Sequence, residues 1–163
     1  MLHVEPAQGT GARSGDNGPM HDTTDADKGG DANAESTPYA QLGGEAGVRA
    51  LVDRFYDTMQ LEARFAELRA MHPGDLGGSR DKLHWFLCGW LGGPALYEQR
   101  FGHPRLRMRH FPYAIGTRER DAWIDCMRQA MDESGLAADL QARLLAAFTG
   151  TADWMRNQPD APA

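Results

Sequence analysis

Cysteine is scarce in this chain of 163 residues, which contains only Cys88 and Cys126. The two are isolated and each lies within a helical pattern, so the sequence favours packed thiols over a disulfide framework or a zinc site. We therefore expect a reducing compartment. Whether either thiol reacts depends on its exposure, which the sequence alone leaves open.

A long apolar run is also missing. The longest nearly apolar stretch, from Leu83 to Tyr97, is interrupted by His84 and by Gly92-Gly93-Pro94, and it falls short of the ~20 residues that a membrane helix needs. The first residues have neither a basic start nor a continuous apolar stretch, so they do not resemble a secretory signal. We expect a cytoplasmic protein with no membrane span. A pI near 5.4 argues against nucleic acid as the main partner.

Aromatic residues are absent from the beginning of the chain, because all 14 of them lie at or after Tyr39. Residues 1–36 hold seven acidic residues against Arg13 and Lys28, a charge of −5. A segment of this composition cannot bury enough surface to fold alone. We predict a disordered N-terminal extension, one folded domain and a short C-terminal tail, which span residues 1–38, 39–157 and 158–163.

Motifs of several common chemistries are missing as well. There is no glycine loop followed by Lys-Ser or Lys-Thr to cradle a phosphate, no nucleophile elbow, no His-Glu-x-x-His and no Cys-x-x-Cys. Strand-like alternation occurs only in Arg105-Leu-Arg-Met-Arg109, which on pattern alone is a candidate short edge strand. The rest of the domain predicts an all-α fold.

Apolar residues recur at helical spacing in that domain. From Val48 to Met59 they follow the i, i+3, i+4, i+7 pattern, which predicts a helix with one buried face. Glycines before Val48 allow only a very short helix ahead of it. Three further helices are predicted, with Ser79 and Thr117 as the caps of the first two. Their apolar positions are Leu83, Phe86, Leu87 and Trp90; Trp123, Met127, Ala130 and Met131; and Leu136, Leu140, Leu144, Ala147, Phe148, Thr151 and Met155.

The most informative stretch runs from Gly102 to Ile115 and places His110 among three arginines, two prolines and a set of apolar side chains. Pro112 directs the backbone just after the histidine, and Arg107 and Arg109 lie close enough to pair with an anion. The apolar shell consists of Met108, Phe111, Tyr113 and Ile115. A buried iron porphyrin requires this chemistry, with one neutral imidazole, apolar walls, and cations near its two carboxylates.

Each candidate also has an ordinary structural interpretation. A lone histidine beside arginines is commonly exposed, and the arginines then form a basic surface strip. Trp123 is on the buried face of a predicted helix, where a tryptophan is more often core than ligand binding. The Tyr56 hydroxyl needs a partner in either case, in the core or in a pocket. His72 lies in a turn, and His84 and His103 also fit exposed positions.

Five ordered blocks at compatible spacing carry more weight than any single motif. They are Tyr39-Ala-Gln-Leu-Gly-Gly44, Arg54-Phe-Tyr56, Lys82-Leu-His-Trp-Phe-Leu87 with Gly92-Gly-Pro-Ala-Leu-Tyr97, Gly102-His-Pro-Arg-Leu-Arg-Met-Arg-His110, and Glu119-Arg-Asp-Ala-Trp123. In these blocks residues 39–157 resemble the group II truncated haemoglobins. The resemblance implies a shortened globin, a sandwich of two helices on two around haem b. The N-terminal extension departs from that pattern.

The resemblance also implies roles for individual residues. His110 matches the proximal iron ligand, and Trp123 and Tyr56 match distal residues on the other side of the haem. Further distal positions match His72, Ser79 and Leu83. The positions that approach the propionates match Arg109, Lys82 and Tyr97, a wall position matches Phe86, and the run around His110 adds Arg107, Met108 and Tyr113.

Three functions remain open at this point. The first is reversible binding and transport of O₂, with CO, NO or peroxide as further ligands, by a monomer or homodimer. The second is a haem-dependent redox enzyme, performing NO dioxygenation or a peroxidase reaction with a reductase partner, in which His72 assists proton transfer. The third, on periodicity alone, is a haem-free helical interaction module.

Overall fold

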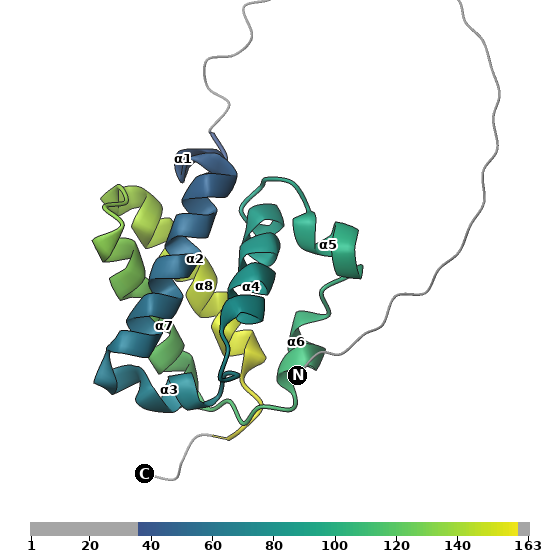
Figure 1. The fold of residues 1–163 in the computed structure, drawn as a ribbon, viewed down its shortest axis with the longest axis vertical. Helices are drawn as coiled ribbons and strands as arrows, with labels where there is room; N and C mark the ends of the chain where they lie inside the picture. Colours follow the sequence, from purple (N-terminus) through teal and green to yellow (C-terminus); the bar gives the residue numbers. More distant parts are fainter. Residues whose placement is uncertain (1–35, 160–163) are drawn as a thin grey trace, which may run out of the picture. The chain divides into compact units, whose positions relative to one another are not determined.

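The computed structural model describes residues 36–159. Residues 1–35 and 160–163 lie outside it, and with them most of the predicted N-terminal extension and C-terminal tail. The described part of the chain forms helices and no strands (Figure 1), which confirms the all-α prediction. No helix within it is long and apolar enough to cross a membrane.

Eight α-helices and one short 3-10 helix follow each other along the described chain. They are α1 (Pro38–Gln41), α2 (Gly44–Leu61), η1 (Ala63–Phe65), α3 (Ala66–Ala70), α4 (Gly77–Trp90), α5 (Leu96–Phe101), α6 (Leu106–His110), α7 (Thr117–Glu133) and α8 (Ala138–Met155). α2 packs against α4, α7 packs against α8, and α2 also contacts α7, so two helix pairs enclose the core. Figure 1 shows the short helices α5 and α6 at the edge of the bundle, away from α7.

The buried face of α2 is the one that the periodicity predicts. Its buried apolar residues run from Val48 to Met59, and Phe55 at the centre is fully buried. A fully buried side chain of this kind contributes about 1.5–3 kcal/mol relative to an exposed one. The start of α2 needs a glycine at position 47, because a Cβ there would lie 1.7 Å from the carbonyl oxygen of Leu42.

Two predicted helix caps are wrong, and a strand that was open on pattern alone does not form. Residues 106–110 form α6 instead of an edge strand, because Leu, Arg and Met are good helix formers and five alternating residues are a weak strand signal. Ser79 does not cap α4, which begins at Gly77. Thr117 is the first residue of α7, and the carboxylate of Glu119 accepts the N–H of Gly116 there at 2.8 Å.

His84 is buried, which corrects the prediction of an exposed position. It faces α2 from α4, with its Nε2 at 3.3 Å from a carboxylate oxygen of Glu45 and with Cys88 one helical turn away. His103, by contrast, is exposed as predicted. Charged groups with a partner can be buried, and a single periodic pattern does not reveal that partner.

Both cysteines are free and fully buried. Burial raises the pKa of the Cys126 thiol to about 12 and also raises the pKa of the Cys88 thiol. Since the thiolate is the reactive form, both side chains behave as packed thiols at neutral pH.

Candidate functional site

His110 ends α6 and is partly buried. Its Nδ1 lies 2.7 Å from the carbonyl oxygen of Leu106, one helical turn earlier. Because a carbonyl oxygen only accepts hydrogen bonds, Nδ1 carries the proton and Nε2 keeps its lone pair. Metal-ligating histidines are oriented in this way, with the other ring nitrogen bound to a carbonyl or carboxylate.

Asn157 holds the loop that follows His110, and sequence reasoning missed it. Its amide donates to the carbonyl of His110 at 3.3 Å and to that of Tyr113 at 2.8 Å. Its side-chain oxygen accepts the N–H of Ile115 at 3.0 Å. No motif marks this residue, since the contacts join the end of the chain to a loop more than 40 residues earlier.

Tyr56, on α2, is buried beside Phe55 and His72, whose ring centroids lie 5.0 Å and 5.8 Å from its own. Its hydroxyl is hydrogen-bonded to the side chain of Ser79 on α4. Burial is the main cause that raises the pKa of the phenol, and the nearby Arg80 cation opposes it. Tyr56 is therefore a neutral hydroxyl at all ordinary pH values, and two predicted distal residues meet at it.

His72 lies in the turn after α3, where its Nδ1 is 2.9 Å from the carbonyl oxygen of Leu68. The same argument as for His110 assigns the proton to Nδ1 and leaves Nε2 as an acceptor. Burial is the main cause that lowers the pKa of His72, and the positive charge of Arg69 lowers it further, as that of His110 does when His110 is protonated. His72 is thus neutral at pH 7.

Trp123 projects from α7 toward the same cluster. Its ring centroid lies 5.2 Å from that of Phe55 and 5.6 Å from that of Phe148, so the indole is fixed by aromatic packing. Its N–H donates to no protein group in the described part of the chain. The indole nitrogen is nevertheless not one of the buried polar atoms that lack a hydrogen-bond partner. The indole donor therefore faces accessible space.

The remaining predicted residues form a wall and a basic rim. Phe86 packs edge to face on Tyr97, with centroids 6.4 Å apart, and Leu83 lies against the core. The guanidinium of Arg109 lies 6.0 Å from the Tyr97 ring, and its Nε donates to the carbonyl of Pro104. Within residues 36–159, neither Arg109 nor Lys82 forms an ion pair with a carboxylate. Arg107 donates a hydrogen bond to the carbonyl of Trp154. Met108 and Tyr113 are exposed.

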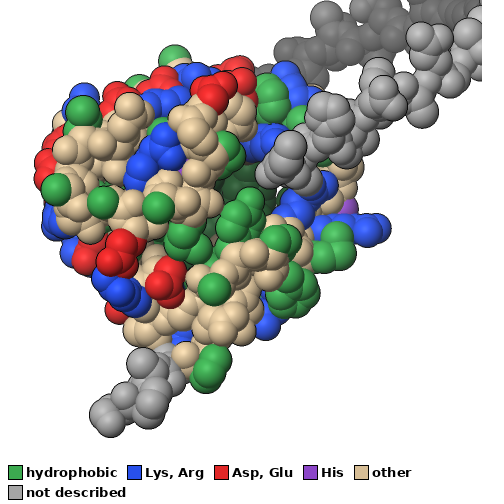
Figure 2. All heavy atoms as spheres, turned by 60° about the horizontal axis from the view of Figure 1, so that its bottom comes forward, with side chains coloured by type: hydrophobic (Ala, Val, Ile, Leu, Met, Phe, Trp, Pro, Cys, Tyr) green, Lys and Arg blue, Asp and Glu red, His purple; other side chains and the backbone are tan. Residues whose placement is uncertain are grey.

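Figure 2 shows a hollow in one face of the molecule, with hydrophobic side chains within it and Lys or Arg side chains near its rim. A smaller cavity of about 530 Å³ lies between α3 and the loop after His110, with Leu68, Met71 and Tyr113 in its lining. A free imidazole Nε2, an apolar hollow, an unpaired indole N–H and two cations without carboxylates are the chemistry that haem requires. The residues present therefore fit haem.

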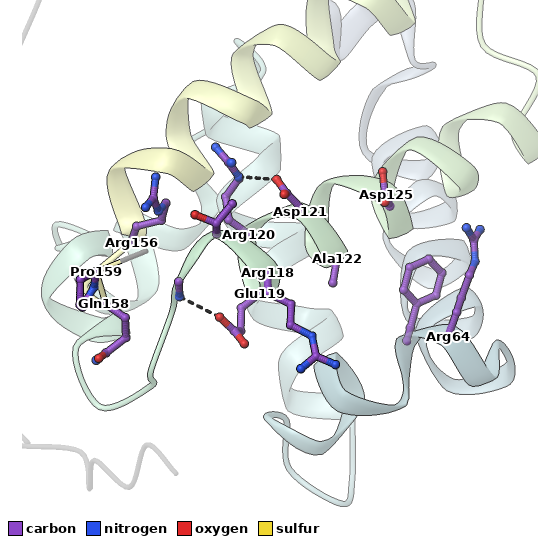
Figure 3. A pocket seen from close by; sticks show the side chains of 13 residues that line it. Arg64, Arg118, Glu119, Arg120, Asp121, Ala122, Asp125, Arg156, Gln158 and Pro159 are labelled. Carbon is purple, nitrogen blue, oxygen red and sulfur yellow. Dashed lines mark hydrogen bonds and ion pairs between the residues drawn. The ribbon is translucent and has the colours of Figure 1, made fainter. Parts of the chain in front are cut away.

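A larger cavity, of about 1020 Å³, lies at the start of α7 and is charged (Figure 3). Three of its four arginines are already neutralised: Arg118 pairs with Glu67, Arg120 with Asp121, and Arg156 with Asp153. It contains none of the predicted site residues. The candidate functional site is therefore the cluster of Tyr56, His72 and Trp123, with His110 close enough to His72 to interact with it electrostatically.

The fold and the site together define a small, all-helical globin. A family model described as bacterial-like globin matches residues 37–157. The chain is 39% identical over 126 residues to a relative named group 2 truncated hemoglobin YjbI from Bacillus subtilis, covering 77% of this chain and 92% of the relative.

Solved structures agree with this match. The group II 2-on-2 hemoglobin of Agrobacterium tumefaciens is 44% identical with a TM-score of 0.74, covering 78% of this chain and 99% of that one. A cold-adapted truncated hemoglobin from Pseudoalteromonas haloplanktis is 42% identical with a TM-score of 0.74, covering 76% of this chain and 100% of that one. The chain belongs to the group II truncated haemoglobins, and its helix pairs are the two-on-two globin sandwich. The cofactor of this family is haem b.

Proposed function

We propose that this protein binds O₂ reversibly at a haem iron held by His110. The observation that carries the proposal is the hydrogen bond from His110 Nδ1 to Leu106, because it fixes the ring and leaves Nε2 free for a metal. Haem supplies an iron atom with an open sixth position for O₂, CO or NO.

Trp123 and Tyr56 provide the hydrogen-bond donors on the distal side. The indole N–H has no protein partner within the described residues, and the neutral phenol keeps its proton at physiological pH. Donors in a water-poor cavity strengthen the binding of a ligand that gains negative charge. Ser79 orients the Tyr56 hydroxyl, and Leu83 supplies apolar surface one turn along α4.

The basic rim holds the two carboxylates of the cofactor. We assign this role to Arg109 and Lys82, with Tyr97 as a platform for the arginine, since both cations lack a carboxylate partner in the described chain. The apolar ring surface would be covered by Phe86, Met108 and Tyr113. Arg107 is directed at Trp154 and takes part less directly.

A redox enzyme is the second candidate, and His72 is the observation that favours it. A neutral imidazole whose Nε2 is an acceptor can take a proton from a peroxide, as a general base does. NO dioxygenation would use the same pocket, and both reactions require a reductase. A high turnover rate with such a reductase would favour the enzyme, and reversible ligation without turnover favours O₂ binding or transport.

The first test is one absorbance spectrum of the full chain purified from haem-replete cells. We expect a Soret band with one haem per chain, and a reversible shift when O₂ is added to the reduced protein. Protein that is folded but takes up no haem would overturn the proposal in favour of a helical interaction module. We further propose a cytoplasmic monomer or homodimer, which size-exclusion chromatography and cell fractionation test.

A further inference from the structure

α5, α6 and the loops beside them carry more positive charge than haem neutralises. Residues 99–117 hold four arginines and no acidic residue. None of the four forms an ion pair with a carboxylate in the part of the chain that the structure describes, whereas every arginine of α2, α4 and α7 does. If Arg109 and Lys82 hold the two carboxylates of haem, the cations that remain are Arg100, Arg105 and Arg107.

Two of these arginines are held on aromatic rings. The guanidinium of Arg107 lies 5.7 Å from the ring centres of both Phe111 and Trp154, which are 57% and 58% exposed. Arg100 lies 4.5 Å above the Trp85 ring and donates to the carbonyl of Leu96. Stacking orders each guanidinium while its charge stays unneutralised. Exposed tryptophan next to arginine is the composition of interface hot spots.

We propose that these residues, here called the basic face (Arg100, Arg105, Arg107, Phe111 and Trp154), dock an acidic one-electron donor protein of the [2Fe–2S] ferredoxin class. The proposal rests on the proposed function, because an iron oxidised to the ferric state must be reduced before it binds O₂ again. The chain has no phosphate-cradling glycine loop for a nucleotide reductant of its own. An external donor is therefore required.

The position of the basic face suits electron transfer. Arg107 lies three residues before His110 on α6, and Phe111 directly follows His110. A partner docked on the basic face is therefore beside the proposed iron ligand. One electron leaves the reduced iron–sulfur cluster and enters the ferric iron, which becomes ferrous. The cluster is oxidised by one electron, and no covalent bond forms or breaks. Opposite charges on the two proteins raise the rate of encounter.

The test uses the full ferric holoprotein and a reduced plant-type [2Fe–2S] ferredoxin, mixed anaerobically in a stopped-flow instrument under CO. Arg100→Glu combined with Arg105→Asn removes charge from the basic face, and asparagine tolerates the left-handed backbone at position 105, where φ is +43°. The matched control combines Arg128→Glu with Arg54→Gln, an equal change of charge on α7 and α2.

We expect the basic-face variant to slow haem reduction about tenfold at low ionic strength, with the control within about twofold of the parent. The difference should vanish at high salt. Hexaammineruthenium(II), a small cationic reductant, should reduce both variants at the parent rate or faster. Titration calorimetry with oxidised ferredoxin gives a readout independent of haem chemistry, and here the basic-face variant should bind about tenfold more weakly.

Equal rates and affinities in the two double variants would overturn the proposal. So would phosphatidylglycerol vesicles that bind the parent and not the basic-face variant while ferredoxin affinity is unchanged, since the face would then serve a membrane. A tenfold gain in ferredoxin affinity on deleting residues 1–36 would mean that the chain's own acidic segment occupies the basic face. That result would also overturn the proposal. Failure of the proposed function, that is, of haem uptake, is detected separately in the absorbance spectrum. Calorimetry tests the docking of ferredoxin even in that case.

Discussion

His72 and His110 are each oriented by the same kind of hydrogen bond. In each, Nδ1–H donates to the carbonyl oxygen four residues earlier, at 2.9 Å for Leu68 and 2.7 Å for Leu106. Protonation of His110 would lower the pKa of His72, so the two rings are also coupled electrostatically. Both present an unprotonated Nε2, and we assign one to iron and the other to a proton.

His110→Gly should abolish ordinary haem binding, because it removes the imidazole that we propose as the iron ligand. Added imidazole should restore the Soret band by taking the vacated position, and the measurement is an absorbance titration of the purified variant. His103→Ala, which changes an exposed histidine, is the control and should keep one haem per chain. Stoichiometric haem with an unchanged ferrous spectrum in the glycine variant would refute the assignment.

Trp123→Phe should raise the O₂ dissociation rate about fivefold, since it removes a donor worth about 1 kcal/mol and keeps the packing on Phe55 and Phe148. Stopped-flow replacement of O₂ by CO measures the rate. Trp85→Phe, on the other side of α4 from this cluster, should leave it within twofold. An unchanged rate in Trp123→Phe would remove the indole from the mechanism.

Stability should fall as the pH is lowered below about 6.5, and His72 contributes to this fall. Burial lowers its pKa in the folded state, so the unfolded chain takes up a proton that the folded protein does not, and acid favours unfolding. The charged or titratable groups around it are Arg69, Tyr56 and His110. In urea titrations from pH 7.5 to 5, His72→Phe should lose less stability than the parent, and equal losses would contradict this origin.

Phe55→Ala should destabilise the fold by about 3–5 kcal/mol, because the side chain is fully buried between Tyr56 and Trp123. Chemical unfolding followed by circular dichroism measures the change. Leu61→Ala, at a position that is 81% exposed, should cost less than about 0.5 kcal/mol. A small effect of Phe55→Ala would mean that the α2 face does not form the core described above.

Deletion of residues 1–36 should leave the haem spectrum and the O₂ affinity unchanged. The reason is compositional, since this segment has no aromatic residue and is strongly acidic, whereas every predicted site residue lies after it. Absorbance spectra and O₂ equilibrium curves of the two proteins test this. A shift in either would show that the segment reaches the pocket.

Much of the fold could be predicted because helical periodicity is a local property. The buried stripe of α2 from Val48 to Met59 and the apolar positions of α7 follow from residue order alone. The candidates for the site came from the composition of the run around His110 and from the resemblance to the group II truncated haemoglobins. Short elements were predicted less well, since in α6 the helix propensity of a few residues competes with an alternating pattern.

The sequence by itself determined the class of fold and the buried faces, because these depend on neighbours within a few turns. Tertiary structure decided which groups meet: the Ser79 hydroxyl at Tyr56, the buried His84 opposite Glu45, and Asn157 on the loop after His110. Those partners lie 23 to 47 residues apart, and the packing of α2 against α4 and of α6 against α8 brings them together. The burial that lowers the pKa of His72 likewise arises only after the helices have packed.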